Sequence, residues 1–112
     1  MEFDLVVRNG TVVTVSDRTD CDVGIRDGKI VALMKGLPKA PREIDAAGRL
    51  VLPGGVEAHC HIEQSSSLGI QTSDDFESGS ISAAFGGNTT IMPFAAQHKG
   101  QSLLDVVADY EA

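Results

Sequence analysis

The 112-residue chain lacks basic clusters and long apolar runs. It carries 9 Lys and Arg against 16 Asp and Glu, for a formal net charge of −7, whereas nucleic acids and anionic membranes attract clustered basic residues. No apolar run approaches the roughly 18 residues of a membrane-spanning helix, and the N-terminus lacks the basic and apolar regions of a signal peptide. We therefore expect a cytoplasmic protein that binds a small molecule, and neither nucleic acid nor a membrane as partner.

Cysteine is also scarce, and repeats and phosphate-binding loops are missing. The two cysteines, Cys21 and Cys60, are too few for a disulfide framework and fit reduced thiols. The dipeptides Asn9-Gly10 and Asp27-Gly28 are interpreted as turns. A nucleotide site would need a strand, then G-x-G-x-x-G, then a helix, and this order does not surround them.

The first fifty residues predict a small antiparallel sheet. Asn9-Gly10 separates two β-rich runs, residues 3–8 and 11–15, and Asp27-Gly28 separates two more, which predicts two hairpins. Residues 43–45 add a short strand. Such a sheet needs a second layer over its apolar face. It contains no convergent polar cluster, so its predicted role is structural.

The remainder of the chain predicts a strand, a helix, a second strand and a second helix, the order of parallel βα units. Pro53-Gly54-Gly55 breaks the chain before the first strand. Thr72 or Ser73 is expected to cap the first helix, with Asp74 and Asp75 in its first turn. Its packing face is expected to contain Phe76, Ser80, Ala83 and Ala84. Gly86-Gly87 ends it, a strand spans residues 88–94, and Ser102 caps a helix with an apolar stripe of Leu103, Val106, Val107 and Tyr110.

Two histidines one residue apart, His59 and His61, end the first of these strands. Alternate residues of a strand share a face, so both imidazoles point one way and Cys60 points the other. Two such nitrogens can chelate one zinc-type ion, which makes half a metal site. The alternative is a pair of hydrogen-bonded structural histidines. Cys60 is interpreted as a small buried hydrophobe.

Longer motifs around this pair resemble the cyclic amidohydrolases of the dihydropyrimidinase and D-hydantoinase family. These motifs are Leu-Pro-Gly-Gly-Val-Glu-Ala-His-Cys-His-Ile-Glu-Gln, then Asp-Asp-Phe-Glu-Ser-Gly at 74–79 and Ala-Ala-Phe-Gly-Gly-Asn-Thr-Thr at 83–90. The sequence departs from the family pattern at Glu57, where aspartate is usual, and at Asn88, where threonine is common. The first departure bears on a contact behind the metal and leaves the reaction class unchanged.

The resemblance implies an α/β protein that is incomplete in this chain. Residues 1–52 would supply N-terminal strands of a β-sandwich, and residues 53–112 the first two βα units of a TIM-type (β/α)8 barrel. Such a barrel needs about 250 residues, so we expect the N-terminal piece of a longer enzyme, one that assembles as a homotetramer by the same resemblance.

The family resemblance also implies the chemistry. The full enzyme would hold two zinc ions bridged by a hydroxide and a carbamylated lysine, with His59 and His61 on the more buried ion. The remaining ligands and the catalytic aspartate would lie outside this chain. The metal-activated hydroxide would hydrolyse the cyclic amide bond of hydantoins or dihydropyrimidines to N-carbamoyl amino acids. No catalytic residue is identified within the 112 residues, which are predicted to be inactive alone.

Three further residues are candidates for substrate contact. By resemblance, Leu68 and Ile70, in the loop after the histidines, would line a pocket for the substrate side chain. They could equally anchor that loop to the barrel rim. His98, in the next loop on the same side, would touch substrate or a subunit interface, or be solvated. Glu63 is interpreted as a loop carboxylate that orients a neighbouring group.

Other functions stay open at this point. The chain could be a non-catalytic fragment, or part of a dihydropyrimidinase-related scaffold that has lost metal ligands. Among enzymes, allantoinase and dihydroorotase share the His-x-His pair after Pro-Gly-Gly. The segment at residues 74–79 favours the hydantoinases.

Overall fold

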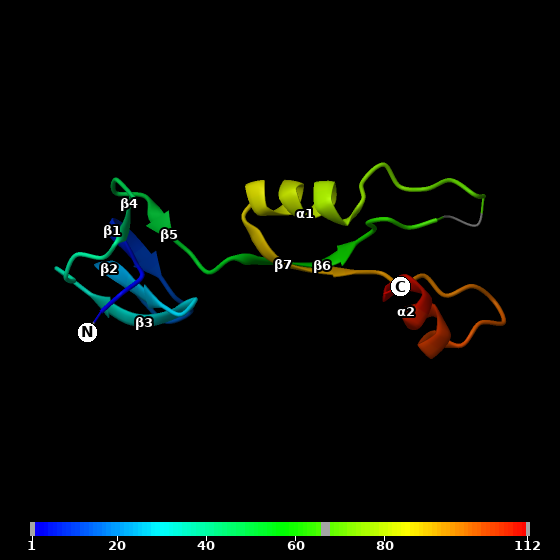
Figure 1. The fold of residues 1–112 in the computed structure, drawn as a ribbon, viewed down its shortest axis with the longest axis horizontal. Helices are drawn as coiled ribbons and strands as arrows, with labels where there is room; N and C mark the ends of the chain where they lie inside the picture. Colours follow the sequence, from blue (N-terminus) through cyan, green and yellow to red (C-terminus); the bar gives the residue numbers. More distant parts are fainter. Residues whose placement is uncertain (1, 66–67, 112) are drawn as a thin grey trace. The chain divides into compact units, whose positions relative to one another are not determined.

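The computed structural model describes residues 2–65 and 68–111. The chain forms two compact units, Met1–Pro53 and Gly54–Ala112, whose elements are labelled in Figure 1. It is rich in strands and has two helices among the described residues. None of these helices has the length and apolar character required to cross a membrane.

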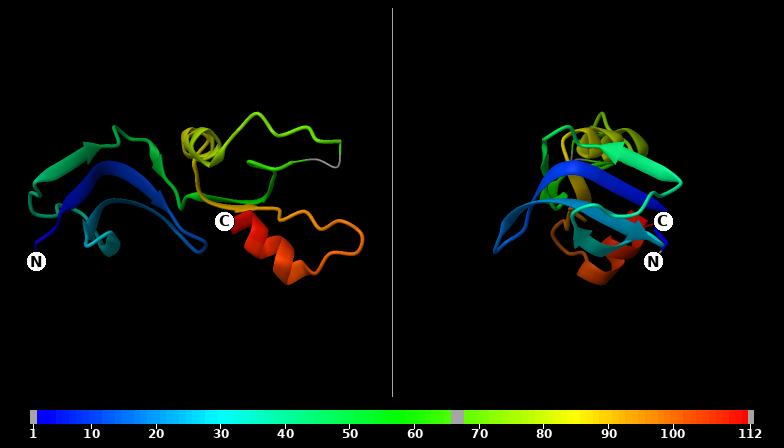
Figure 2. Two further views of the ribbon diagram at one scale, coloured as in Figure 1. Left: turned by 45° about the vertical axis from the view of Figure 1, so that its right-hand side comes forward. Right: turned by 90° about the vertical axis from the view of Figure 1, so that its left-hand side faces the viewer.

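The first unit is a five-stranded sheet built around its first strand, and Figure 2 shows it from two further sides. β1 pairs antiparallel with β2, which pairs antiparallel with β3. β4 and β5 both pair parallel with β1. The sheet is therefore mixed: the expected antiparallel pairing is present among β1, β2 and β3, and the expectation is wrong for β4 and β5. Its strands are β1 (Leu5–Val13), β2 (Arg18–Arg26), β3 (Lys29–Met34), β4 (Arg42–Asp45) and β5 (Leu50–Val51).

The predicted hairpin at Asn9-Gly10 is also wrong, because β1 runs straight through this pair. The register with β2 shifts between Val7 and Gly10, and Asn9 has a φ of 55°. The pair is thus a bulge inside a strand. It faces the turn between β4 and β5: the Gly48 N–H donates to the Asn9 carbonyl (2.8 Å). A Cβ on Gly10 would lie 2.5 Å from Val51 Cγ2, so only glycine fits there.

The predicted hairpin at Asp27-Gly28 is confirmed. Arg26 pairs with Lys29 across the turn, and Asp27 and Gly28 have φ values of 51° and 71°. Positive φ at both central residues is what a tight type I′ turn requires. The hairpin between β1 and β2 instead turns through residues 14–17, where the Thr14 N–H donates to the Asp17 carbonyl (2.8 Å).

The core of the first unit is small. Phe3, Val6 and Leu37 form a buried cluster against which Ala32 and Ala40 pack. Val12 and Val23 are also buried. Several large apolar side chains of the unit remain exposed: Ile30, Leu33, Met34, Ile44 and Leu50. The sheet is therefore covered only in part within the described residues, as a sheet that needs another layer would be.

The second unit alternates strands and helices, and α1 lies alongside its parallel strand pair (Figure 1). This order and the parallel pairing confirm the predicted βαβ pattern. The predicted loop at residues 62–71 includes residues 66 and 67, which lie outside the described residues. The elements are β6 (Gly55–Cys60), α1 (Phe76–Phe85), β7 (Asn88–Pro93) and α2 (Leu103–Glu111).

Neighbouring residues determine where α1 begins and where it ends. Asp75 is the N-cap: its carboxylate accepts the Ser78 N–H (2.7 Å), and the Ser78 hydroxyl receives the Asp75 N–H (3.2 Å). Hydrogen bonds to the Asp75 carboxylate, first from the Ser78 N–H and then from the Ser78 side chain, lower the pKa of Asp75. The prediction that Thr72 or Ser73 caps the helix is therefore wrong. Gly86 is the C-cap, as predicted.

Candidate functional site

Two glycines place the start of β6 close against β7. A Cβ on Gly54 would lie 2.0 Å from Thr89 Oγ1, and one on Gly55 would lie 2.2 Å from Asn88 Oδ1. Distances this short leave no space for a side chain at either position. The glycines thus allow β6 to run beside β7 and carry His59 and His61 to the C-terminal end of the strand pair, where α/β folds place functional groups.

The two imidazoles lie next to each other at the end of β6. Their ring centroids are 5.5 Å apart, and both residues are exposed. Phe94, the residue after β7, packs against both rings, at 4.5 Å from His59 and 5.3 Å from His61. The ring planes of His61 and Phe94 are 15° apart, a stacked arrangement. Sequence reasoning missed Phe94; its place at the end of the neighbouring strand was the available signal.

Hydrogen bonds hold the backbone and side chains of this pair. The Glu57 carboxylate accepts the backbone N–H of His59 (3.0 Å). The Phe94 N–H donates to the Cys60 carbonyl (3.0 Å), which extends the strand pairing beyond Pro93. His61 Nδ1 lies 2.6 Å from Gln64 Oε1, and Gln64 Nε2 donates to the Phe94 carbonyl (2.7 Å). Gln64 was also missed by sequence reasoning.

Glu63 connects the loop after β6 to the start of α1. Its carboxylate accepts the Phe76 N–H (3.0 Å), and its own N–H donates to the Asp74 carbonyl (2.9 Å). The first N–H groups of a helix have no partner inside the helix, so the carboxylate satisfies one of them. Glu63 therefore orients a neighbouring element, the role that the sequence suggested.

The two histidines are the residues of this site that could hold a divalent ion. Neutral imidazole is a good ligand for zinc, and the two ring centroids lie 5.5 Å apart at one strand end. Among the described residues, no cluster of three or more His, Cys, Asp or Glu could hold a metal.

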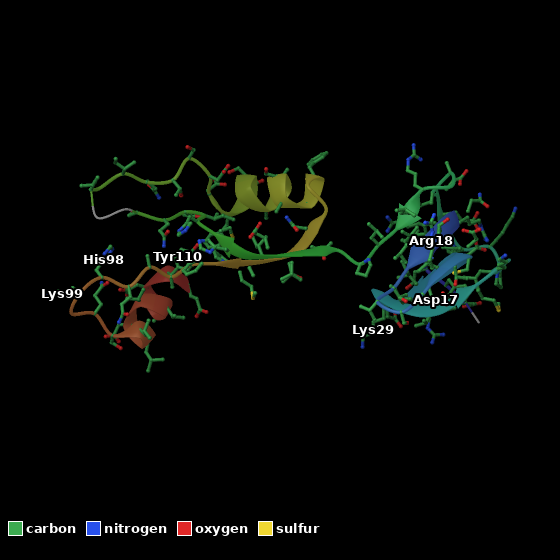
Figure 3. The ribbon with its side chains drawn as sticks, turned by 180° about the vertical axis from the view of Figure 1, so that it is seen from behind. Asp17, Arg18, Lys29, His98, Lys99 and Tyr110 are labelled. Carbon is green, nitrogen blue, oxygen red and sulfur yellow. The ribbon has the colours of Figure 1, made fainter. Side chains whose placement is uncertain are left out.

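The candidate substrate contacts have different surroundings. Leu68 and Ile70 are 82% and 65% exposed in the loop between β6 and α1. His98, labelled in Figure 3, is exposed in the loop between β7 and α2. It lines a shallow cavity of about 300 Å³ together with Glu63 and Gln64. The substrate roles of Leu68, Ile70 and His98 stay predictions.

Tyr110 ties α2 to the residue that follows His61. Its hydroxyl donates to the Ile62 carbonyl (2.6 Å), and Figure 3 shows it on α2. Burial raises the pKa of Tyr110, so the phenol keeps its proton to donate. Sequence reasoning assigned Tyr110 only to an apolar stripe.

Known proteins resemble this chain over nearly its whole length. No family model matches it. A D-hydantoinase from Ralstonia pickettii is 44% identical over 109 residues, 97% of this chain and 24% of that protein. The rat dihydropyrimidinase is 40% identical over 107 residues, 90% of this chain and 20% of that protein. A solved D-hydantoinase structure superposes with a TM-score of 0.87 at 43% identity, covering 97% of this chain and 24% of that one.

Proposed function

We propose that this chain, a homologue of D-hydantoinases and dihydropyrimidinases that spans about a quarter of their length, is part of a metal-dependent cyclic amidohydrolase. The full-length protein would hydrolyse the cyclic C–N bond of hydantoins or dihydropyrimidines to N-carbamoyl amino acids. The observation that carries the proposal is the adjacent pair of His59 and His61 at the end of β6, within a chain so similar to hydantoinases.

The two units would have different roles in that enzyme. The sheet of the first unit would be half of a β-sandwich, and the β6–α1–β7–α2 unit would begin a (β/α)8 barrel. The parallel pairing of β6 with β7 supports this proposal, as does the position of the histidines at the C-terminal strand end, where barrel enzymes carry their chemistry.

His59 and His61 would hold a divalent ion of zinc type, one of a pair bridged by a carbamylated lysine elsewhere in the protein. A bound ion of this kind polarises an amide carbonyl and lowers the pKa of a bound water. The residues of this chain would bind and orient. Each histidine would present a ring nitrogen, and Phe94 would cover both rings on one side and limit the access of water to them.

The test uses the full-length protein and hydantoin or dihydrouracil, with release of the N-carbamoyl amino acid as the measurement. We expect turnover that a chelator abolishes and zinc restores. Removing a partner behind a metal ligand typically costs 10–100-fold, so we expect His59→Ala and His61→Ala, which remove ligands, to lower kcat/KM by more than about 100-fold. Gln71→Ala, at an exposed position in the loop between β6 and α1, is the control.

Three results would count against the proposal. Turnover that survives both histidine substitutions would remove the metal role of the pair. A full-length protein that binds zinc and hydrolyses neither substrate would favour allantoinase or dihydroorotase activity, and one that binds no zinc would favour the related non-catalytic scaffold.

A further inference from the structure

Gln64 occupies a position between His61 and Phe94 in which its amide can be oriented in one way only. A backbone carbonyl accepts hydrogen bonds and cannot donate them. The amide atom facing the Phe94 carbonyl at 2.7 Å must therefore be the NH₂ group. The amide oxygen then faces His61 Nδ1, at 2.6 Å.

This orientation determines the tautomer of His61. An amide oxygen only accepts, so the Nδ1 atom it faces must carry the proton. A neutral imidazole has one N–H and one lone pair, so the lone pair of His61 lies on Nε2. The chain of bonds from the Phe94 carbonyl through Gln64 thus leaves His61 Nε2 free of a proton, as metal binding requires.

We propose that Gln64 is a positioning residue that fixes the tautomer and ring orientation of His61 for metal binding. The inference rests on the proposed metal role of the histidine pair. It differs from that role in assigning a function to a residue that binds neither metal nor substrate: Gln64 would act only through His61.

The surroundings of Gln64 support this role. Its backbone N–H donates to Thr72 Oγ1 (3.0 Å), and the Thr72 N–H donates back to the Gln64 carbonyl (3.0 Å). These bonds fix the Gln64 backbone to the segment that leads into α1. Phe94 contributes twice, since its carbonyl orients the amide and its ring stacks on the His61 imidazole. Phe94, at the end of β7, therefore helps to fix the orientation of His61, at the end of β6.

A structural role alone would make a different prediction. If Gln64 only linked the loop to β7, its loss would loosen the loop without changing which nitrogen of His61 carries the proton. The tautomer of His61 is therefore the decisive measurement, and metal affinity is the consequence to be measured beside it.

The experiment uses the full-length protein with ¹⁵N-labelled histidine, first metal-free at about pH 8.5, roughly two units above the ordinary histidine pKa. Long-range ¹H–¹⁵N correlations report which nitrogen is protonated. We expect His61 to be protonated at Nδ1 in the wild type and in Gln64→Glu, whose carboxylate still accepts that N–H. In Gln64→Met, which cannot accept it, we expect the preference to be lost.

Zinc affinity is then measured by competition with a chromophoric chelator. We expect Gln64→Met to bind zinc about 10–100-fold more weakly, the usual cost of losing such a partner. Gln64→Glu should lie between this variant and the wild type, because it keeps the bond to His61 and loses the one to Phe94. Gln71→Met, at an exposed position in the same loop, should match the wild type in both measurements.

The outcomes separate this inference from the proposed function. An unchanged tautomer or an unchanged zinc affinity in Gln64→Met would overturn the role of Gln64 while leaving the hydrolase proposal intact. A wild type that binds no zinc would refute the metal role of the pair, and the metal-free tautomer would still decide whether Gln64 sets His61. If Gln64→Met does not fold, a Gln64→Glu protein with a reversed tautomer would equally overturn the inference.

Discussion

At the scale of single residues, Arg8 is the most connected side chain of the first unit. Its guanidinium donates to the Leu37 carbonyl and the Pro38 carbonyl, both at 3.0 Å, and to the carboxylates of Asp22 and Glu43. The bond from Arg8 and a second from the Ala40 N–H lower the pKa of Glu43 to about 2. Arg8 therefore joins β1, β2 and β4 through charge-assisted bonds.

The depressed pKa of Glu43 predicts how the stability of this unit depends on pH. A carboxyl whose folded pKa lies below its unfolded value stabilises the fold above the unfolded pKa. This contribution should be present above pH 4.5 and disappear as the pH falls toward about 2. Because the pair is partly exposed, we expect a modest effect that salt weakens.

Hydrogen exchange of the β1 and β4 amides in the full-length protein, corrected for intrinsic rates, tests this expectation. Glu43→Gln should exchange faster than the wild type at pH 6, and this difference should become much smaller as the pH falls to about 2. Glu2→Gln, exposed near the N-terminus, is the control. A difference between Glu43→Gln and the wild type that is as large at pH 2 as at pH 6 would contradict the assignment.

Two similar dipeptides show how far local sequence determines a turn. Asp27-Gly28 makes its hairpin at an open position: a Cβ on Gly28 would meet no atom within 4 Å, and the Asp4 carboxylate accepts the Asp27 N–H (2.6 Å). Asn9-Gly10 has the same local preference but lies between β2 on one side and the β4–β5 turn on the other. Distant partners keep β1 continuous there, and no local rule could predict them. Gln64 was missed for the same reason, since its role depends on Phe94, thirty residues later.

At the scale of elements, α1 packs through its one glycine. Gly79 is the buried residue of this helix, and it contacts Ile62, which is itself buried. The predicted packing face is largely wrong, because Phe76, Ser80 and Ala84 are exposed, only Ala83 is half-buried, and Gly79 was left out. A prediction from apolar periodicity cannot detect a glycine selected for close approach. The existence of both helices and of β6 and β7 was predictable because each depends on a run of residues.

Gly79→Ala should destabilise α1. The new Cβ would lie 2.9 Å from Ile62 Cδ1 and 3.1 Å from Cγ1, which is overpacking that typically costs about 1–3 kcal/mol. Alanine recovers up to about 1 kcal/mol through its higher helix propensity. We expect a net loss of protection against hydrogen exchange in the α1 amides. Ser80→Ala, exposed on the same helix, should show none, and increased protection in Gly79→Ala would refute this packing.

At the scale of the whole molecule, the 112 residues leave much apolar surface uncovered. Phe85 is 90% exposed, Leu104 is 81% exposed and Ile30 is 67% exposed. Monomeric soluble proteins rarely expose large contiguous apolar patches, which commonly mark surfaces that another segment covers. The chain spans about a quarter of the hydantoinases it matches, and we expect the remaining three quarters to cover these side chains.

This expectation gives a comparison between the isolated 112 residues and the full-length protein. The isolated chain should bind a hydrophobic dye strongly and self-associate, because large apolar side chains of its described residues are exposed.

The isolated chain should also hold zinc weakly and show no hydantoin hydrolysis, because its described residues offer only the two imidazoles as a cluster. Two ligands leave an ion without the three or four protein ligands of stable zinc sites. Dye fluorescence, sedimentation, equilibrium dialysis and turnover would test both statements. Hydrolysis by the isolated chain would mean that a complete site exists within 112 residues, and the assignment of the remaining ligands to the rest of the protein would then be wrong.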